Sequence, residues 1–261
     1  MRQVFAICKR EFNSYFKSPM GWVVFAIYAF VSGLYFSSML LSGYSDVAAI
    51  LQFMKSLFFV LIPIITMRTI SEDKKNGTLV LLATSPAATG QIVVGKYLGV
   101  VLMFMTVSSV NLIYLFTTLG LGGTADSRFW GTLIAYLLTA FAYIAIGIFA
   151  SALTENQIIA AIISFVIFIG FDILNALSSI MGTLVTSFFN KIDFFNIIPP
   201  TFDQSAGHAV VAALEWINPT NRLSSFYQGT FDLLSVIYFI GLIMIFLYIT
   251  YQIMESRRWA E

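Results

Sequence analysis

The chain alternates long apolar segments with short polar ones, and this pattern predicts membrane-spanning helices. A helix needs about 20 mostly apolar residues to cross the hydrocarbon layer. Six runs approach or exceed this length, namely Gly21–Leu41, Phe53–Met67 with a possible extension at Val47–Leu51, Ile92–Leu121, Trp130–Leu153, Ile158–Leu177 and Leu233–Met254. The runs are continuously apolar, whereas barrel strands would be short and alternate polar with apolar residues. We therefore predict an all-α polytopic membrane protein with six transmembrane helices.

Composition agrees with this class. Of the 261 residues, 59% are hydrophobic and only 10% are charged, against about 25% charged residues in soluble domains. The first apolar run is longer than that of a signal peptide and lacks a small-residue cleavage site, so we expect it to be retained. These features indicate an integral membrane protein.

The segment before the first span, residues 1–19, predicts a further helix. Apolar side chains alternate with basic ones at helical spacing, which is typical of an amphipathic helix lying in the membrane interface. A basic tail that only sets the orientation of the first span is the alternative.

The most polar stretch of the chain runs from Arg68 to Lys96, between the second and third apolar runs. Its residues predict a helical approach over Arg68–Lys75, a break at Asn76-Gly77, an amphipathic turn or two over Thr78–Thr84 and a stop at Ser85-Pro86. Such a short helix with a breaker on either side can move as a unit. The alternative is an ordinary solvated loop between two spans.

The distribution of cations predicts the orientation. Lys and Arg near span ends are retained on the cytoplasmic side. With six spans, both termini and the even-numbered loops share one face, which holds ten of the 14 cations; Lys55, Arg128, Lys191 and Arg222 fall on the other. We therefore expect both termini and the Arg68–Lys96 segment in the cytoplasm.

Residues for catalysis are scarce. Cys8 and His208 are the single cysteine and histidine, which excludes an intrachain disulfide, a CxxC site and an HExxH zinc site. The stretch Gly90–Lys96 has the spacing of a phosphate-binding loop, but Tyr97 stands where Ser or Thr would hold magnesium. We interpret Gly95 and Gly99 instead as small residues that allow close helix approach. No cofactor is expected on this chain.

A few polar residues lie inside the predicted spans. Asp172 is an intramembrane acid in the fifth run, where it indicates either a functional site or a side chain that reaches interfacial water. Asn111 in the third run predicts an interhelical hydrogen bond, and Pro63 in the second predicts a kink.

The polar segment also carries a family resemblance. It reads Arg68-Thr-Ile-Ser-Glu-Asp-Lys-Lys-Asn-Gly-Thr-Leu-Val-Leu-Leu-Ala-Thr-Ser-Pro86, followed by Gly95-Lys96-Tyr97. This order resembles the loop between the second and third spans of type-2 ABC exporter permeases, the ABC-2 family. The C-terminal part is similar to the gliding-motility-type branch of that family, through Ser225-Phe226, Gly229, Asp232, Tyr238-Phe239 and Met254-Glu-Ser-Arg-Arg-Trp259.

The resemblance implies a single six-span permease domain over residues 1–261. Two permease chains, identical or homologous, would pair in the plasma membrane, and each would dock a separately encoded ATPase that binds ATP and magnesium. A membrane-anchored auxiliary subunit is a further implied partner, and nucleic acid is not. The alternative function is a secondary transporter or channel-like protein, for which internal repeats or several midplane charges would be expected.

The resemblance also implies site residues. Residues 68–91 would form the cytoplasmic coupling loop and its coupling helix, and residues 178–232 the extracellular or re-entrant region. The implied ATPase contacts are Glu72, Asp73, Lys74, Gly77, Thr78, Leu81, Leu82 and Pro86, with a second cytoplasmic contact at Glu155 and Asn156. The second contact has an equally good interpretation as a simple polar turn.

Overall fold

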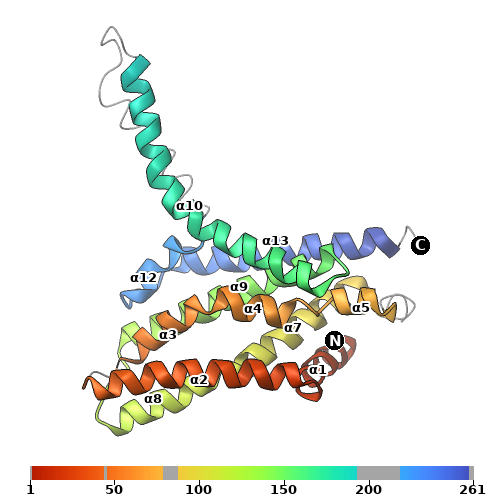
Figure 1. Ribbon diagram of the computed structural model, residues 1–261, viewed down its shortest axis with the longest axis horizontal. Coiled ribbons are helices and arrows are strands. Elements are labelled where there is room, and N and C mark those ends of the chain that lie inside the picture. Colours follow the sequence, from red (N-terminus) through yellow and green to blue (C-terminus); the bar gives the residue numbers. More distant parts are fainter. Residues whose placement is uncertain (1, 44–45, 79–87, 193–217, 259–261) are drawn as a thin grey trace. The chain divides into compact units, whose positions relative to one another are not determined.

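The computed structural model describes residues 2–43, 46–78, 88–192 and 218–258. Every regular element in these ranges is a helix (Figure 1), which confirms the all-α prediction. The chain divides into two compact units, unit 1 with Met1–Phe165 and Ser225–Glu261, and unit 2 with Val166–Ser224. The predicted single domain over residues 1–261 stays a prediction.

The helices follow the apolar runs of the sequence. In chain order they are α1 (Arg2–Lys17), α2 (Pro19–Leu41), α3 (Val47–Ser56), α4 (Phe58–Thr66), α5 (Ser71–Lys75), α7 (Thr89–Ser108), α8 (Val110–Gly120), α9 (Ser127–Leu153), α10 (Gln157–Ile192), the 3₁₀ turn η1 (Asn221–Leu223), α12 (Ser224–Tyr227) and α13 (Leu233–Arg258). Pro19 begins α2, where its fixed φ suits the first turn and its missing amide is not needed.

Five of the predicted spans are single apolar stretches, over residues 19–41, 89–120, 127–153, 157–174 and 233–256. The second span differs, because α3 and α4 meet at Leu57 with a bend of 59°. The kink predicted at Pro63 therefore does not mark the main break, and Pro63 lies inside α4. Counting the bent pair as one span gives the predicted six.

The fifth span continues further than predicted. The apolar run ends at Leu177, but α10 is helical to Ile192. The residues from Ser178 to Ile192 contain no proline, and they extend the same helix into the region expected to be extracellular or re-entrant. Residues 193–217 of that region lie outside the described part of the chain.

Helix α9 forms the centre of unit 1. It is the most buried of the candidate spans, and it contacts α3, α4, α7 and α13. Small residues allow this close packing: a Cβ atom added at Gly147 would lie 2.2 Å from Oγ1 of Thr66 on α4. Small side chains at such positions let helix backbones approach within a membrane.

Hydrogen bonds between buried polar side chains join the spans of unit 1. The Asn111 amide of α8 donates to the Tyr28 hydroxyl of α2 at 2.6 Å, and Tyr28 bonds to the Tyr136 hydroxyl of α9 at 2.8 Å. The Ser108 hydroxyl of α7 reaches Tyr136 at 3.1 Å. The interhelical role predicted for Asn111 is thus confirmed, and each hydroxyl avoids the cost of burial without a partner.

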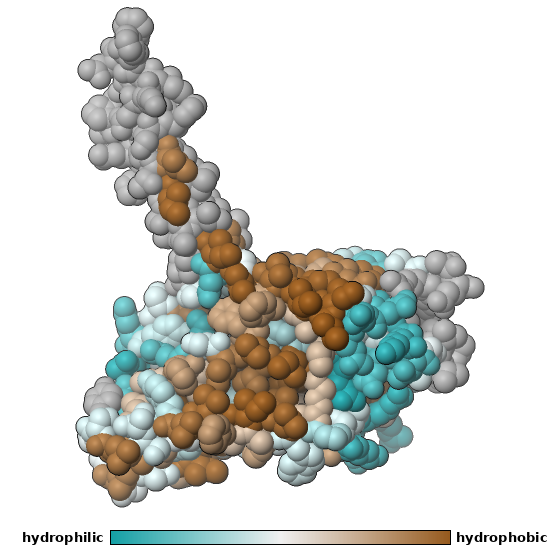
Figure 2. Space-filling model, viewed as in Figure 1, coloured by the Kyte–Doolittle hydropathy of each residue, from teal (hydrophilic) through white to brown (hydrophobic). Residues whose placement is uncertain are grey.

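Polar residues gather at the ends of unit 1, and one end carries most of them. Figure 1 shows α1, α5 and the C-terminal end of α13 at this end, which we call the termini face. Hydrophilic residues cover the termini face in Figure 2, whereas apolar residues cover the middle of the unit. This separation is what a bilayer-spanning bundle requires.

Candidate functional site

The candidate site begins where the second span leaves the apolar layer. Helix α5 carries Glu72, Asp73, Lys74 and Lys75 in succession, and Asn76 is its C-cap. Gly77 then adopts a φ of +68°, a left-handed conformation that glycine reaches without steric cost. The break predicted at Asn76-Gly77 is confirmed.

Lys96 is the hub of the site. It lies about two turns into α7 and is 2% exposed, so its ammonium group needs partners. The ammonium pairs with the carboxylates of Glu11 on α1 and of Asp73 on α5, the latter at 2.6 Å. It also donates to the carbonyl of Thr69 at 2.6 Å. One buried cation therefore holds α1, α5 and α7 together.

Asp73 stays ionised within this cluster. Burial alone would raise the pKa of its carboxyl group, but the Lys96 ammonium and hydrogen bonds from Lys96 and Thr78 outweigh burial, and the pKa lies below its ordinary value. The Thr78 hydroxyl donates to Oδ1 of Asp73 at 2.7 Å, across the break at Gly77. The residue that follows the break is thus tied back to α5.

Glu72 belongs to a second cluster at the junction of α1 and α2. Its carboxylate accepts from Nε of Arg68 at 2.9 Å, one helical turn earlier. The Arg68 guanidinium also donates to the Ser18 hydroxyl at 2.9 Å and lies 5.8 Å from the centre of the Tyr15 ring. Arg68 therefore links the start of the polar segment to the turn between the first two helices.

The polar segment is also anchored to α9. The buried Ser151 hydroxyl accepts the backbone amides of Ile70 and Ser71, both at 3.0 Å, and donates to the carbonyl of Met67 at 3.0 Å. The ammonium of Lys74 donates to the carbonyl of Ala152. Helix α5 is thus held at the end of the central helix by both backbone and side-chain contacts.

A polar cavity of about 220 Å³ lies between these elements. Its lining combines the two clusters with nearby side chains, namely Arg10, Glu11, Ser14, Tyr15, Arg68, Thr69, Glu72, Asp73, Asn76, Thr78 and Lys96. Three cations face three carboxylates, so the lining is formally neutral. The site is therefore a balanced ionic joint between α1, α5 and α7.

Two glycines of α7 bring α1 close enough for this joint. A Cβ atom added at Gly95 would lie 2.8 Å from Cβ of Ile7, and one added at Gly99 would lie 2.6 Å from Cβ of Glu11. The close approach predicted for Gly95 and Gly99 is confirmed. The stretch Gly90–Lys96 lies within the regular helix α7, with its lysine buried in ion pairs, so it lacks the open loop that cradles phosphate.

The other predicted site residues are not among those that line the cavity of the joint. Asn156 caps the start of α10, because its side chain accepts the amide of Ile158 at 2.9 Å, and Glu155 is exposed beside it. Asp172 is exposed on α10 and accepts from the Thr220 hydroxyl at 3.4 Å within unit 2. Leu81, Leu82 and Pro86, with most of the expected coupling helix, lie outside the described residues.

Sequence reasoning did not find Glu11 or Ser151. A signal for Glu11 was present, since an ionisable residue at position 96 in an apolar run requires a partner of opposite charge. Nothing in the sequence distinguishes Ser151 from the other serines of the spans. Its role follows from its position opposite the end of α4.

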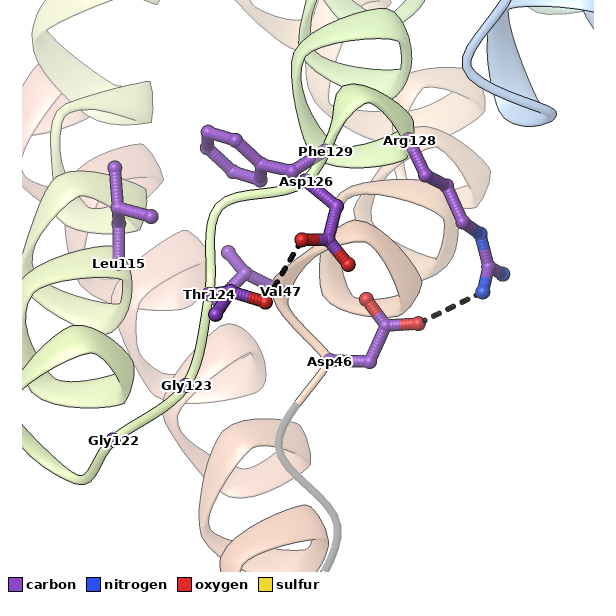
Figure 3. A pocket seen from close by; sticks show the side chains of 9 residues that line it. All are labelled: Asp46, Val47, Leu115, Gly122, Gly123, Thr124, Asp126, Arg128 and Phe129. Carbon is purple, nitrogen blue, oxygen red and sulfur yellow. Dashed lines mark hydrogen bonds and ion pairs between the residues drawn. The ribbon is translucent and has the colours of Figure 1, made fainter.

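The end of unit 1 opposite the termini face holds a larger cavity, of about 350 Å³ (Figure 3). Arg128 at the start of α9 pairs with Asp46 at 3.3 Å, and Asp46 caps α3 by accepting the amide of Ala48 at 2.9 Å. Thr124 donates to Asp126 at 2.8 Å. These contacts tie together the connections before α3 and α9, and none of the predicted site residues lies here.

The fold and the site define a polytopic membrane protein with a charged joint on its termini face. The family model described as ABC-2 family transporter protein matches residues 5–258, so the chain belongs to this family. It is a membrane-spanning permease of an ABC transporter, a transport subunit without catalysis of its own. The comparison with curated proteins finds no match to the chain.

Proposed function

We propose that this chain is the permease half of an ATP-driven exporter, working as a dimer with separately encoded ATPase subunits. The observation that carries the proposal is the joint at Lys96, which binds α1 and α5 to the third span. A force applied to α5 from outside the membrane would pass through this joint to α7. The same proposal includes membership of the gliding-motility branch. It also includes a second permease chain, identical or homologous, and a membrane-anchored auxiliary subunit.

The polar segment is suited to contact a motor protein. Helix α5 is held on two sides, by Lys96 and by Ser151. After α5 the chain passes Gly77 and continues into the segment that carries Leu81 and Leu82. We propose that this segment docks the ATPase with Glu72, Asp73, Lys74, Gly77, Thr78, Leu81, Leu82 and Pro86. The turn at Glu155 and Asn156 would make a second contact.

The first test concerns Glu72 and Gly77 in the reconstituted complex with its ATPase. Glu72→Ala removes the proposed charge-assisted contact between Glu72 and the ATPase. Loss of such a contact lowers the binding free energy by an amount on the order of 1.5–3 kcal/mol. We expect at least tenfold weaker docking of the ATPase to permease in nanodiscs, with normal membrane insertion. Gly77→Pro should have the larger effect, because proline cannot adopt the positive φ found there.

Two control variants accompany this test. Gly77→Asn should lose far less docking than Gly77→Pro, because asparagine tolerates the left-handed conformation and a Cβ atom there meets no atom of the described residues within 4 Å. Asp126→Ala, at the opposite end of unit 1, should have no effect. Wild-type docking and ATP turnover in both Glu72→Ala and Gly77→Pro would reduce the segment to a solvated loop.

We further propose that the termini face is cytoplasmic and that the protein lies in the plasma membrane. Cys8 cannot report the side, because it is 5% exposed and burial raises the pKa of its thiol. In a Cys8→Ser background we expect Ser42→Cys to react with a membrane-impermeant maleimide in intact cells. Asn13→Cys, exposed on α1, should react only after permeabilisation. The reverse pattern would place the joint outside the cell.

A further inference from the structure

The outer surface of α1 carries an aromatic strip. One stripe of the helix, including Cys8 and Tyr15, is buried against its neighbours. Beside this stripe lie Phe5, Phe12 and Phe16, whose spacings of seven and four residues place them on one side of a helix. Phe5 is 68% exposed. Phe12 and Phe16 are partly exposed, so the strip lies at the open edge of α1, beside its buried stripe.

The strip continues onto the first residues of the first span. The rings of Phe12 and Phe16 lie 5.1 Å apart, and those of Phe16 and Trp22 lie 5.5 Å apart. The Trp22 indole, which is 60% exposed, donates to the carbonyl of Phe16 at 3.1 Å. Because α2 crosses the membrane from this point, the strip lies at the depth where tryptophan marks the boundary between headgroups and acyl chains.

The charges that α1 exposes beside the strip are all positive. Arg2, Lys9 and Lys17 are exposed, and none of them pairs with a carboxylate of the described residues. Glu11 is the single acidic residue of α1, and its charge is used by the buried Lys96. Because Lys96 neutralises Glu11 inside the joint, the charges on the outer surface of α1 are all positive.

We propose that α1 is a binding site for anionic phospholipids of the leaflet in which it lies. The phenylalanine strip would enter the acyl region, while Arg2, Lys9 and Lys17 contact headgroup phosphates. The bilayer satisfies both halves of this surface, since it supplies hydrocarbon and negative charge side by side. An acidic soluble partner would match the cations alone. The inference needs no ATPase partner and stands apart from the proposed function.

The experiment uses Trp22 as the probe in the full chain, with the three other tryptophans replaced by phenylalanine. Brominated phosphatidylglycerol and brominated phosphatidylcholine quench tryptophans that they contact, so the two titrations give a ratio of association constants next to α1. We expect a preference of at least about fivefold for phosphatidylglycerol, the effect of one basic residue near an anionic surface. High salt should reduce this ratio, because exposed charges are screened.

Two matched variants decide the outcome. Arg2→Gln, Lys9→Gln, Lys17→Gln should bring the ratio close to one, whereas Arg2→Lys, Lys9→Arg, Lys17→Arg should keep it. Slow labelling of the buried Cys8 thiol in both variants verifies that α1 remains packed on α7. A preference that survives in the glutamine variant, or equal quenching by the two lipids in the wild type, would overturn the proposal. Equal quenching would favour a soluble acidic partner.

Discussion

Replacing Lys96 by methionine is expected to detach α1 and α5 from the third span. The substitution leaves the carboxylates of Glu11 and Asp73 in a buried site without their cation. Removing one partner of a buried ion pair costs about 3–5 kcal/mol, which corresponds to a factor of more than 100 in a local opening equilibrium. The measurement is the labelling rate of Cys8, which is buried on α1 and becomes accessible when this helix opens.

Two further variants separate the ion pair from a general loss of charge. Lys75→Met removes an exposed cation of α5, and a change within about 0.5 kcal/mol is expected. In the triple variant Glu11→Gln, Asp73→Asn, Lys96→Met the two carboxylates that Lys96 neutralised are uncharged as well, so most of the lost stability should return. If Cys8 of Lys96→Met reacts at the wild-type rate, Lys96 does not hold the joint together.

The second large effect is expected from Gly95→Ala combined with Gly99→Ala. The added Cβ atoms would meet Ile7 Cβ at 2.8 Å and Glu11 Cβ at 2.6 Å, and both neighbours belong to a helix that must then shift. Overpacking of this kind costs about 1–3 kcal/mol per site. We expect faster labelling of Cys8 and a lower thermal midpoint in detergent. Because Glu11 moves with α1, the ion pair with Lys96 should weaken as well.

Gly90 provides the matched control on the same helix. The nearest atom to an added Cβ there is a ring carbon of Tyr251 at 3.9 Å, an ordinary contact distance. Gly90→Ala should therefore leave stability unchanged or raise it by up to about 1 kcal/mol, through the better helix propensity of alanine. Equal effects of the Gly90 and Gly95/Gly99 changes would mean that the close approach of α1 to α7 does not contribute to stability.

The class of protein and the number of spans could be predicted from the sequence. Continuous apolar runs of membrane-spanning length admit few structures, because backbone groups in hydrocarbon must be paired within a helix. The break at Gly77 and the close helix approach at Gly95 and Gly99 were also predictable from local residue types. In each case a local residue type has a physical property that holds in any fold.

The bend at Leu57 depended on the tertiary structure, and the extension of α10 to Ile192 was not predicted. Pro63 was the visible candidate for a kink, yet the break falls between α3 and α4, where both helices pack on α9. Hydrophobicity alone ends the fifth span at Leu177. It carries no information on whether the helix continues beyond that residue.

The partners of Lys96 were decided by the tertiary structure alone. The sequence determined that Lys96 lies in an apolar run and that Glu72 and Asp73 gather in a polar segment. It did not determine that Lys96 pairs with Glu11, 85 positions away, or that Ser151 anchors α5 from the end of α9. Such contacts depend on which helices lie side by side, and that arrangement follows from packing over the whole bundle and not from any local pattern.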